Sequence, residues 1–356
     1  MKRIAGLDQL RFILALCVLM PHCHLVPDFS GQPRGSLIEL GFRAVANNLV
    51  NPVAAVIVFF VISGFCIHLP YRNQQSIPLV PYFTRRFVRI LIPMGAAVLL
   101  ANPLQLKLPL FSNSILWSLV CEEVYYILYP SLRRVAARVG WVRLFGASFV
   151  VALALALYSL RTNDVTLGMY PAYGASLTWL LGLPCWLLGC ILAERSELLH
   201  RTITSPQIWS WRFAIWFAAW VCSVLKFHSQ LGYPLTLNFF AILAFFWLQR
   251  EIAFYRTRRP LALLERNGAW SYSMYLIHLH AQAVYLLVGI PALLFPIGWA
   301  VHLIFILLLC YVFYLVVEAP SHKLARYLST MISNRLSYEK ITGAPVLSAA
   351  SDAGVD

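Results

Sequence analysis

The feature that most limits how this chain can fold is a succession of apolar stretches, each about as long as a membrane-spanning helix. One crossing of a bilayer needs roughly 20 mainly apolar residues. Such stretches follow one another along the sequence at residues 10–27, 48–69, 88–104, 114–131, 142–160, 176–193, 210–227, 233–249, 270–290 and 297–317. They predict an all-α, polytopic membrane protein with about ten transmembrane helices. The third stretch is the least regular, because Pro93 and Pro103 interrupt it.

Composition also indicates that a bilayer is the solvent for much of this chain. Of its 356 residues, 60% are hydrophobic and 12% are charged, whereas about 25% of the residues in a soluble domain are charged. The first apolar stretch contains Arg11 and His22 and no small-residue cleavage motif follows it, so it is not expected to be a cleaved signal peptide. We expect one membrane domain over residues 1–329 and a flexible, polar cytoplasmic tail over 330–356.

The distribution of positive charge predicts the orientation of these helices, because cytoplasmic loops of membrane proteins carry an excess of Lys and Arg. With the N-terminus inside and ten spans, both termini are cytoplasmic. Of the 28 Lys and Arg residues, the predicted outer segments then hold only Arg34, Arg43, Lys107, Arg161 and Lys226. The net charge of +14 follows from this topology in the inner or plasma membrane, and it requires no nucleic-acid partner.

The eight cysteines indicate packing rather than metal binding or disulfide formation. All lie in or beside apolar stretches, and none forms a CxxC pair. Isolated cysteines in such places act as small apolar residues. We expect no metal site and no permanently bound cofactor.

Two ionisable residues in the first stretch, Arg11 and His22, are candidates for catalysis, because such groups are costly inside a bilayer. They are 11 residues apart, so a helix places them on one face and separates them by roughly 16 Å along its axis. An apolar environment favours the neutral imidazole, which can accept a proton as a general base. Two structural explanations remain open. His22 can be hydrogen-bonded into helix packing, and Arg11 can pair with Asp8, three residues before it.

A basic run at the start of the third stretch is a candidate site for a phosphorylated ligand. Arg85 and Arg89 share a helix face, and Arg86 lies beside them. Guanidinium groups bind phosphates through paired hydrogen bonds, so a donor such as acyl-CoA would fit. The alternative is that these arginines only anchor the helix at the cytoplasmic surface.

The fourth stretch carries two consecutive glutamates after Trp117 and Ser118. Helical spacing gathers four residues into one polar and aromatic stripe: Glu122, Tyr125, Tyr126 and Tyr129. The Glu122 carboxylate can orient His22 or neutralise a buried arginine, either Arg11 or one in the third stretch.

Other polar positions carry weaker signals. Gly64 in the second stretch favours close helix packing, and Ser63 beside it is a less favoured nucleophile. His278 and His280 lie in the ninth stretch, and Glu318 precedes Pro320 at the end of the last.

Several segments, in this order, resemble motifs of the acyltransferase-3 family of bacterial membrane O-acyltransferases. They are Gly6–Arg11, the Arg-x10-His spacing of Arg11 and His22, Phe59–Phe65, Arg85–Arg89, Trp117–Tyr126, Tyr275–His278 and Glu318-x-Pro320. Cys121 and Val124 depart from the residues more common in the Trp117–Tyr126 motif. The predicted outer loops are short, and we do not expect the fused esterase-like domain that some members carry.

This resemblance implies an enzyme that moves an acyl group, commonly acetyl, from cytosolic acyl-CoA to a hydroxyl of a sugar or other acceptor. His22 would be the catalytic histidine, Arg11 its motif partner, and Arg85, Arg86 and Arg89 the donor-binding residues. The short outer loops leave lipid-linked or smaller acceptors open. Direct transfer and a covalent acyl-histidine route are both compatible with the sequence.

Two other interpretations also fit buried charges in a membrane protein. A secondary transporter would use them as a substrate or proton path, and it would show paired broken helices in two related halves. A membrane acyltransferase of another class would depend on a late histidine, His278 or His280, and not on His22.

Overall fold

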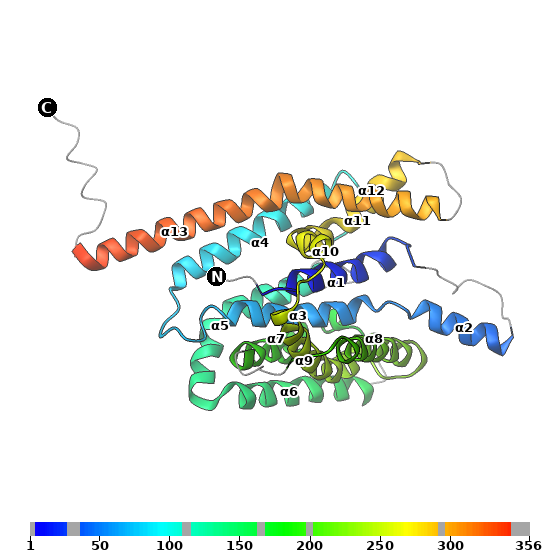
Figure 1. The fold of residues 1–356 in the computed structure, drawn as a ribbon, viewed down its shortest axis with the longest axis horizontal. Helices are drawn as coiled ribbons and strands as arrows, with labels where there is room; N and C mark the ends of the chain where they lie inside the picture. The colour runs from blue at the N-terminus through cyan, green and yellow to red at the C-terminus, as the bar shows by residue number, and fades with distance from the viewer. Residues whose placement is uncertain are drawn as a thin grey trace.

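The computed structural model describes residues 4–26, 36–108, 115–161, 168–196, 202–290 and 296–342. All the secondary structure that these residues form is helical (Figure 1). The α-helices are α1 Leu7–His22, α2 Leu37–Asn47, α3 Pro52–His68, α4 Leu79–Ala101, α5 Leu116–Val139, α6 Trp141–Arg161, α7 Gly174–Arg195, α8 Ser205–His228, α9 Tyr233–Thr257, α10 Ala262–Asn267, α11 Ser271–Val288, α12 Ile297–Phe313 and α13 Ala319–Thr342. Short turns of other helix types are η2 Tyr170–Tyr173, η4 Gly268–Trp270 and the π-turn η5 Tyr314–Glu318.

The helices pack as layers that run roughly parallel to the long axis of the molecule (Figure 1). α13 and α4 pack together along one side, and α1 lies in the middle, where it packs against both α3 and α11. α3 packs most closely against α7, while α6 and α9 cover other faces of α7. α2 projects at the end opposite the junction of α5 and α6.

Burial separates the central helices from the peripheral ones. The most apolar windows of α3 and of the η2–α7 segment are each 72% buried, whereas those of α6 and α8 are 11% and 22% buried. A helix that is hydrophobic all round belongs in a core or a membrane. The peripheral helices therefore present apolar surface outward, which suits contact with lipid.

Each of the ten apolar stretches coincides with one helix, from α1 and α3 to α11 and α12. Within the described residues, six helical segments are long and apolar enough to cross a membrane: 45–68, 141–158, 170–195, 205–228, 233–257 and 297–337. The helices α1, α4, α5 and α11 do not meet that measure; α1, for example, has only 16 residues. The third stretch forms one continuous helix, α4, through Pro93.

Local sequence signals set several helix starts. Asn51 precedes α3, and its side-chain oxygen accepts the backbone N–H of Ala54 at 3.0 Å. Pro52 then occupies the first position of α3, where a missing N–H has no cost. Thr204 and Gln207 form a capping box at the start of α8.

The crossing of α3 and α7 depends on two glycines. A Cβ atom at Gly64 would lie 2.0 Å from the carbonyl oxygen of Trp186, and one at Gly189 would lie 2.0 Å from that of Val61. Only glycine allows the two backbones to approach this closely. The packing interpretation of Gly64 therefore agrees with the structure.

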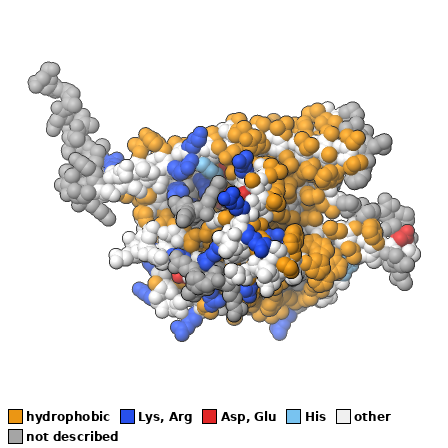
Figure 2. Space-filling view, in the orientation of Figure 1, with side chains coloured by type: hydrophobic (Ala, Val, Ile, Leu, Met, Phe, Trp, Pro, Cys, Tyr) orange, Lys and Arg blue, Asp and Glu red, His pale blue; other side chains and the backbone are white. Residues whose placement is uncertain are grey.

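The C-terminal region is helical beyond the boundary at residue 329 that the sequence suggested. α13 continues to Thr342, and its first half packs along α4. The rest of the expected flexible tail, residues 343–356, lies outside the described residues. On the face shown in Figure 2, Lys and Arg side chains lie toward the left and centre, and hydrophobic side chains dominate the right.

Candidate active site

A pair of histidines from α1 and α11 forms the centre of the candidate site. His22 ends α1 and His278 lies in the second turn of α11. The Nδ1 atom of His22 and the Nε2 atom of His278 are 3.1 Å apart, and the two rings are nearly parallel at 18°. His278 is fully buried, whereas His22 as a whole residue is exposed. His22 thus lies at the edge of the bundle, and His278 supports its ring from within.

The partners of His278 determine which ring nitrogen carries a proton. Its Nδ1 atom lies 3.0 Å from the carbonyl oxygen of Met274 and 2.9 Å from that of Tyr275. Carbonyl oxygens only accept, so Nδ1 donates, and Nε2 of the neutral ring accepts. The donor to Nε2 is then the Nδ1–H group of His22. This arrangement leaves the lone pair on Nε2 of His22, which is the form that a general base requires.

Tyr275 connects this pair to the start of α5. Its hydroxyl donates to the carbonyl of Ile115 at 2.9 Å and accepts from the hydroxyl of Ser118 at 2.5 Å. The rings of Phe59 and Tyr275 also meet edge to face, with centroids 6.3 Å apart. Trp117, beside Ser118, stacks on Tyr170 at 5.4 Å. The two predicted motif residues Trp117 and Ser118 therefore fix α5 against its neighbours.

Glu122 lies in a chain of hydrogen bonds, not in an ion pair with His22 or Arg11. The hydroxyl of Tyr126 donates to Glu122, and the hydroxyl of Ser63 lies 2.9 Å from that of Tyr126. Trp186 Nε1 donates to Ser63 at 3.3 Å. Because Tyr126 uses its proton on the carboxylate, Ser63 donates to Tyr126. Ser63 thus positions a tyrosine here, and the structure shows no base beside it among the described residues.

The arginines of α4 differ in their environments. Arg85 is exposed, while the guanidinium of Arg86 lies over the ring of Tyr126, 5.8 Å from its centroid. Arg89 donates from Nε to Nε2 of His322 at 3.0 Å. Arg11 and Arg86 are near enough to Arg89 to influence it electrostatically. Arg86 and its neighbour Arg89 thus bring positive charge close to Tyr126, which donates to Glu122, and this favours an anionic ligand.

Arg11 and Glu318 complete this charged layer. Arg11 pairs with Asp8 at 3.5 Å, as the local interpretation of its sequence position predicted. Glu318 is buried, and its Oε2 atom accepts the backbone N–H of Ser273 at 3.0 Å and its hydroxyl at 2.5 Å. Ser273 is the third residue of α11, so the carboxylate satisfies a free N–H of the helix start and lies at its positive end.

Two other histidines, each two residues from a member of the pair in the sequence, lie outside it. His280 Nε2 donates to the carbonyl of Ala97 at 2.8 Å and so connects α11 to α4. His24 follows α1 with a φ of 53°, and its side chain is exposed. His22 and His278, which the sequence offered as alternatives, are direct partners.

Several residues of the site were not predicted. His322 holds Arg89, but it lies in a polar segment beyond the last apolar stretch. Glu123 is 9% exposed, and neither of its carboxylate oxygens has a hydrogen-bond partner among the described residues. The two consecutive glutamates in an apolar stretch indicated a polar site, but the sequence did not show which of them would be hydrogen-bonded. No group of three or more His, Cys, Asp or Glu within the described residues is arranged to hold a metal ion.

Comparison with known proteins assigns the family. Residues 4–315 match the model of the acyltransferase-3 family, which is described as an acyltransferase domain. The chain is 24% identical over 314 residues to acyltransferase MdmB of Streptomyces mycarofaciens, covering 78% of each protein. No solved structure matches the chain. With the family match spanning nearly all of the helical bundle, the chain is an acyltransferase that belongs to the acyltransferase-3 family.

Proposed function

We propose that this protein is a membrane O-acyltransferase that moves an acyl group, most simply acetyl, from cytosolic acyl-CoA to a hydroxyl group. The acceptor is a sugar or another cell-envelope or exported molecule, including lipid-linked ones. Family membership supports the transfer chemistry and favours the enzyme over the transporter interpretation. The observation that carries the proposal is the pair of His22 and His278, which presents a basic nitrogen on an accessible ring.

His22 is the general base of the proposed reaction, and His278 is its positioning residue. Nε2 of His22 takes the proton of the acceptor hydroxyl as the oxygen attacks the thioester carbonyl carbon. The carbon–sulfur bond breaks, and the CoA thiolate leaves with the proton that His22 gives up. His278 holds His22 in the required tautomer through its buried Nε2 atom. Direct attack needs no covalent acyl-histidine, although that route uses the same nitrogen.

The proposed donor site is the group of Arg11, Arg85, Arg86 and Arg89, which we call the arginine layer. The phosphates of acyl-CoA would bind beside Arg86 and Arg89, with Arg11 nearby and the exposed Arg85 toward the entrance. Ser273, which bonds Glu318 in this layer, and His278 are five residues apart on α11, a rise of about 7.5 Å. A long donor that is anchored on the arginines can therefore extend along α11 toward His22.

We propose that the protein lies in the inner or plasma membrane. In the proposed topology it has ten membrane helices, and both termini are in the cytoplasm. It rests on the coincidence of ten apolar stretches with ten helices and on the uneven distribution of Lys and Arg. This orientation places the arginine layer toward the cytosolic donor and His22 deeper, toward an acceptor on the outer side.

The test compares His22→Ala with a neighbouring histidine variant. Mass spectrometry of envelope glycans and small metabolites, from cells with and without the protein, identifies the acylated product. The purified proteins in lipid nanodiscs are then supplied with labelled acetyl-CoA and that acceptor. We expect His22→Ala to lose about 10²–10⁴-fold in rate, the usual worth of a general base.

The matched control is His24→Asn, because Asn tolerates the positive φ at this position. This variant should transfer at nearly the wild-type rate. A near-normal rate for folded His22→Ala would contradict the assignment of the base. Absence of any acylated product with the wild-type protein would contradict the proposed function itself.

A further inference from the structure

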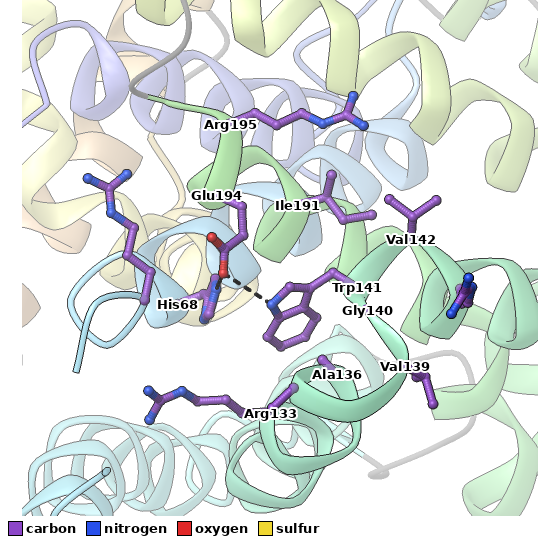
Figure 3. A pocket seen from close by; sticks show the side chains of 13 residues that line it. His68, Arg133, Ala136, Val139, Gly140, Trp141, Val142, Ile191, Glu194 and Arg195 are labelled. Atoms are coloured by element: carbon purple, nitrogen blue, oxygen red, sulfur yellow. Dashed lines mark hydrogen bonds and ion pairs between the residues drawn. The ribbon is translucent and has the colours of Figure 1, made fainter. Parts of the chain in front are cut away.

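A polar cavity lies away from the histidine pair, between the ends of α3, α5 and α7 and the start of α6. Its volume is about 620 Å³. Among the described residues that line it, one is a carboxylate, Glu194, and four are arginines: Arg72, Arg133, Arg143 and Arg195. Figure 3 shows Arg133 and Arg195 on opposite sides of the space, with Glu194 and Trp141 between them. The cavity is therefore strongly cationic.

Glu194 is already used by the wall of the cavity. Its Oε1 atom accepts from Nε2 of His68 at 2.7 Å and from Nε1 of Trp141 at 3.2 Å (Figure 3). His68 in turn lies 2.9 Å from the hydroxyl of Tyr129 through its Nδ1 atom. Since the carboxylate takes the proton of Nε2, Nδ1 of a neutral His68 accepts from Tyr129. This network holds the indole of Trp141 in the cavity.

Two of the arginines are held in place by hydrogen bonds. Arg72 donates to the carbonyl of Ala193 at 3.0 Å and to the hydroxyl of Ser196 at 2.8 Å. Arg133 donates to the backbone carbonyl of Gln74. These bonds orient the two guanidinium groups. Oriented guanidinium groups in a concave site are suited to a phosphate group.

The cavity is separate from the proposed donor site. Three tyrosine rings, Tyr71, Tyr82 and Tyr129, pack against one another with centroids 5.7–6.2 Å apart. Tyr129 faces His68 of the cavity, whereas Tyr82 donates to the carbonyl of Tyr126, the residue beneath Arg86. This aromatic layer stands between the two groups of arginines, so a second ligand can bind independently of the donor.

The rim of the cavity indicates an amphiphilic ligand. Val139 and Val142 line it and are 40% and 57% exposed. They continue into the outward apolar surface of α6, whose spanning window is only 11% buried. A phosphate in the cavity would therefore have hydrocarbon chains beside α6 if it belonged to a lipid. Basic pockets between membrane helices bind anionic headgroups in this way.

We propose that the cavity of Arg72, Arg133, Arg143 and Arg195 binds the headgroup phosphate of an anionic phospholipid, with its acyl chains along α6. The proposal does not depend on the acyltransfer mechanism, because it is tested by measuring lipid binding and not by measuring enzyme activity. It predicts selectivity for negative headgroups, which plain hydrophobic contact does not give. It also predicts that a soluble phosphate ester binds weakly, since it lacks the chains.

Native mass spectrometry of the purified full-length protein tests this inference with phosphatidylglycerol, phosphatidylcholine and glycerol phosphate. The cavity variant is Arg143→Gln with Arg195→Gln, two exposed side chains. The control is Arg134→Gln with Arg138→Gln, which removes the same charge from α5 outside the lining. We expect phosphatidylglycerol binding to weaken about tenfold or more in the cavity variant, because charge-assisted bonds are lost, and to change little in the control.

Three outcomes would overturn the proposal. Equal losses in the two double variants would reduce it to general surface attraction. Equal binding of phosphatidylcholine would remove the role of negative charge. Full competition by glycerol phosphate would assign the cavity to a soluble ligand. Thermal unfolding of each variant excludes a folding defect, and the single variant Arg143→Gln, expected to show a smaller loss in the same direction, replaces the double variant if that does not fold.

Discussion

At the scale of single residues, the site depends on partners that assign each polar group one role. His278 is buried and donates to two backbone carbonyls, so its other nitrogen has to accept. His22 supplies that donor and keeps a free lone pair. Tyr126 similarly donates to Glu122 and accepts from Ser63. The chemistry of His22 thus follows from hydrogen bonds, and not from its position in the sequence alone.

Replacing His278 should test its positioning role. His278→Gln keeps a side-chain oxygen that can accept from Nδ1–H of His22, whereas His278→Leu removes the acceptor. We expect kcat to fall about tenfold in His278→Leu, the worth of about one buried hydrogen bond, with the KM for acyl-CoA unchanged. His278→Gln should recover part of the loss.

Kinetics of both variants in nanodiscs checks this expectation. A purely structural role would predict that the two substitutions reduce the amount of folded protein without separating kcat from KM. Equal kcat values for His278→Gln and His278→Leu would show that acceptance of the His22 proton does not matter.

At the scale of helices, close crossings and helix starts place the site residues. Gly64 and Gly189 bring α3 and α7 into backbone contact, and Trp186 of α7 then reaches Ser63 of α3. Glu318 caps the start of α11 through Ser273, which fixes the helix that carries His278. The orientation of the His22–His278 pair is therefore coupled to contacts a turn or more away.

Gly64→Ala should destabilise the fold, since its Cβ atom would lie 2.0 Å from the carbonyl oxygen of Trp186. Overpacking of this kind costs roughly 1–3 kcal/mol. The matched control is Gly146→Ala in α6, where, among the described residues, no atom beyond the adjoining part of the same helix lies within 4 Å of the new Cβ atom. Alanine should be neutral or slightly stabilising there, by up to about 1 kcal/mol. Thermal unfolding in one detergent compares them, and equal midpoints would show that the α3–α7 crossing is not tight.

At the scale of the whole molecule, burial varies across the helix bundle, and positive charge varies along it. Across the bundle, α3 and α7 are enclosed while α6 and α8 turn apolar surface outward. Along the bundle, both groups of arginines lie near the end where α3 finishes and α4 begins. A bilayer accommodates both divisions, with lipid around the bundle and water at its charged end.

Reporter fusions should place the charged end in the cytoplasm. Green fluorescent protein fused after Arg258, beyond α9, is expected to fluoresce, because it folds in the cytoplasm. Alkaline phosphatase fused after Gly289, beyond α11, is expected to be active, because it requires the oxidising outer side. These two positions are separated by the span α11 in the ten-helix topology. A dark fluorescent-protein fusion together with an inactive phosphatase fusion would contradict that topology. If the two fusions reported the same side of the membrane, a crossing by α11 would be contradicted.

Much of the architecture was predictable because lipid imposes a simple rule on sequence. A helix that crosses hydrocarbon must be apolar for most of its length, and this requirement is visible without any knowledge of neighbours. The positions of the helices and the family motifs around Arg11, His22 and Trp117 could therefore be recognised in the sequence. Pro93 was misleading, because α4 continues through it within a packed bundle.

The sequence alone determined that this chain is helical and rich in membrane-length apolar stretches, and it predicted His22 and Arg89 as candidate site residues. Only the tertiary structure paired His22 with His278 and Arg89 with His322, across 256 and 233 residues. It also formed the cavity around Trp141 from four separate helices. The physical reason is the distance along the chain over which each property is set. The apolar length of a helix depends on its own residues, whereas the partner of a hydrogen bond depends on which distant helix packs beside it.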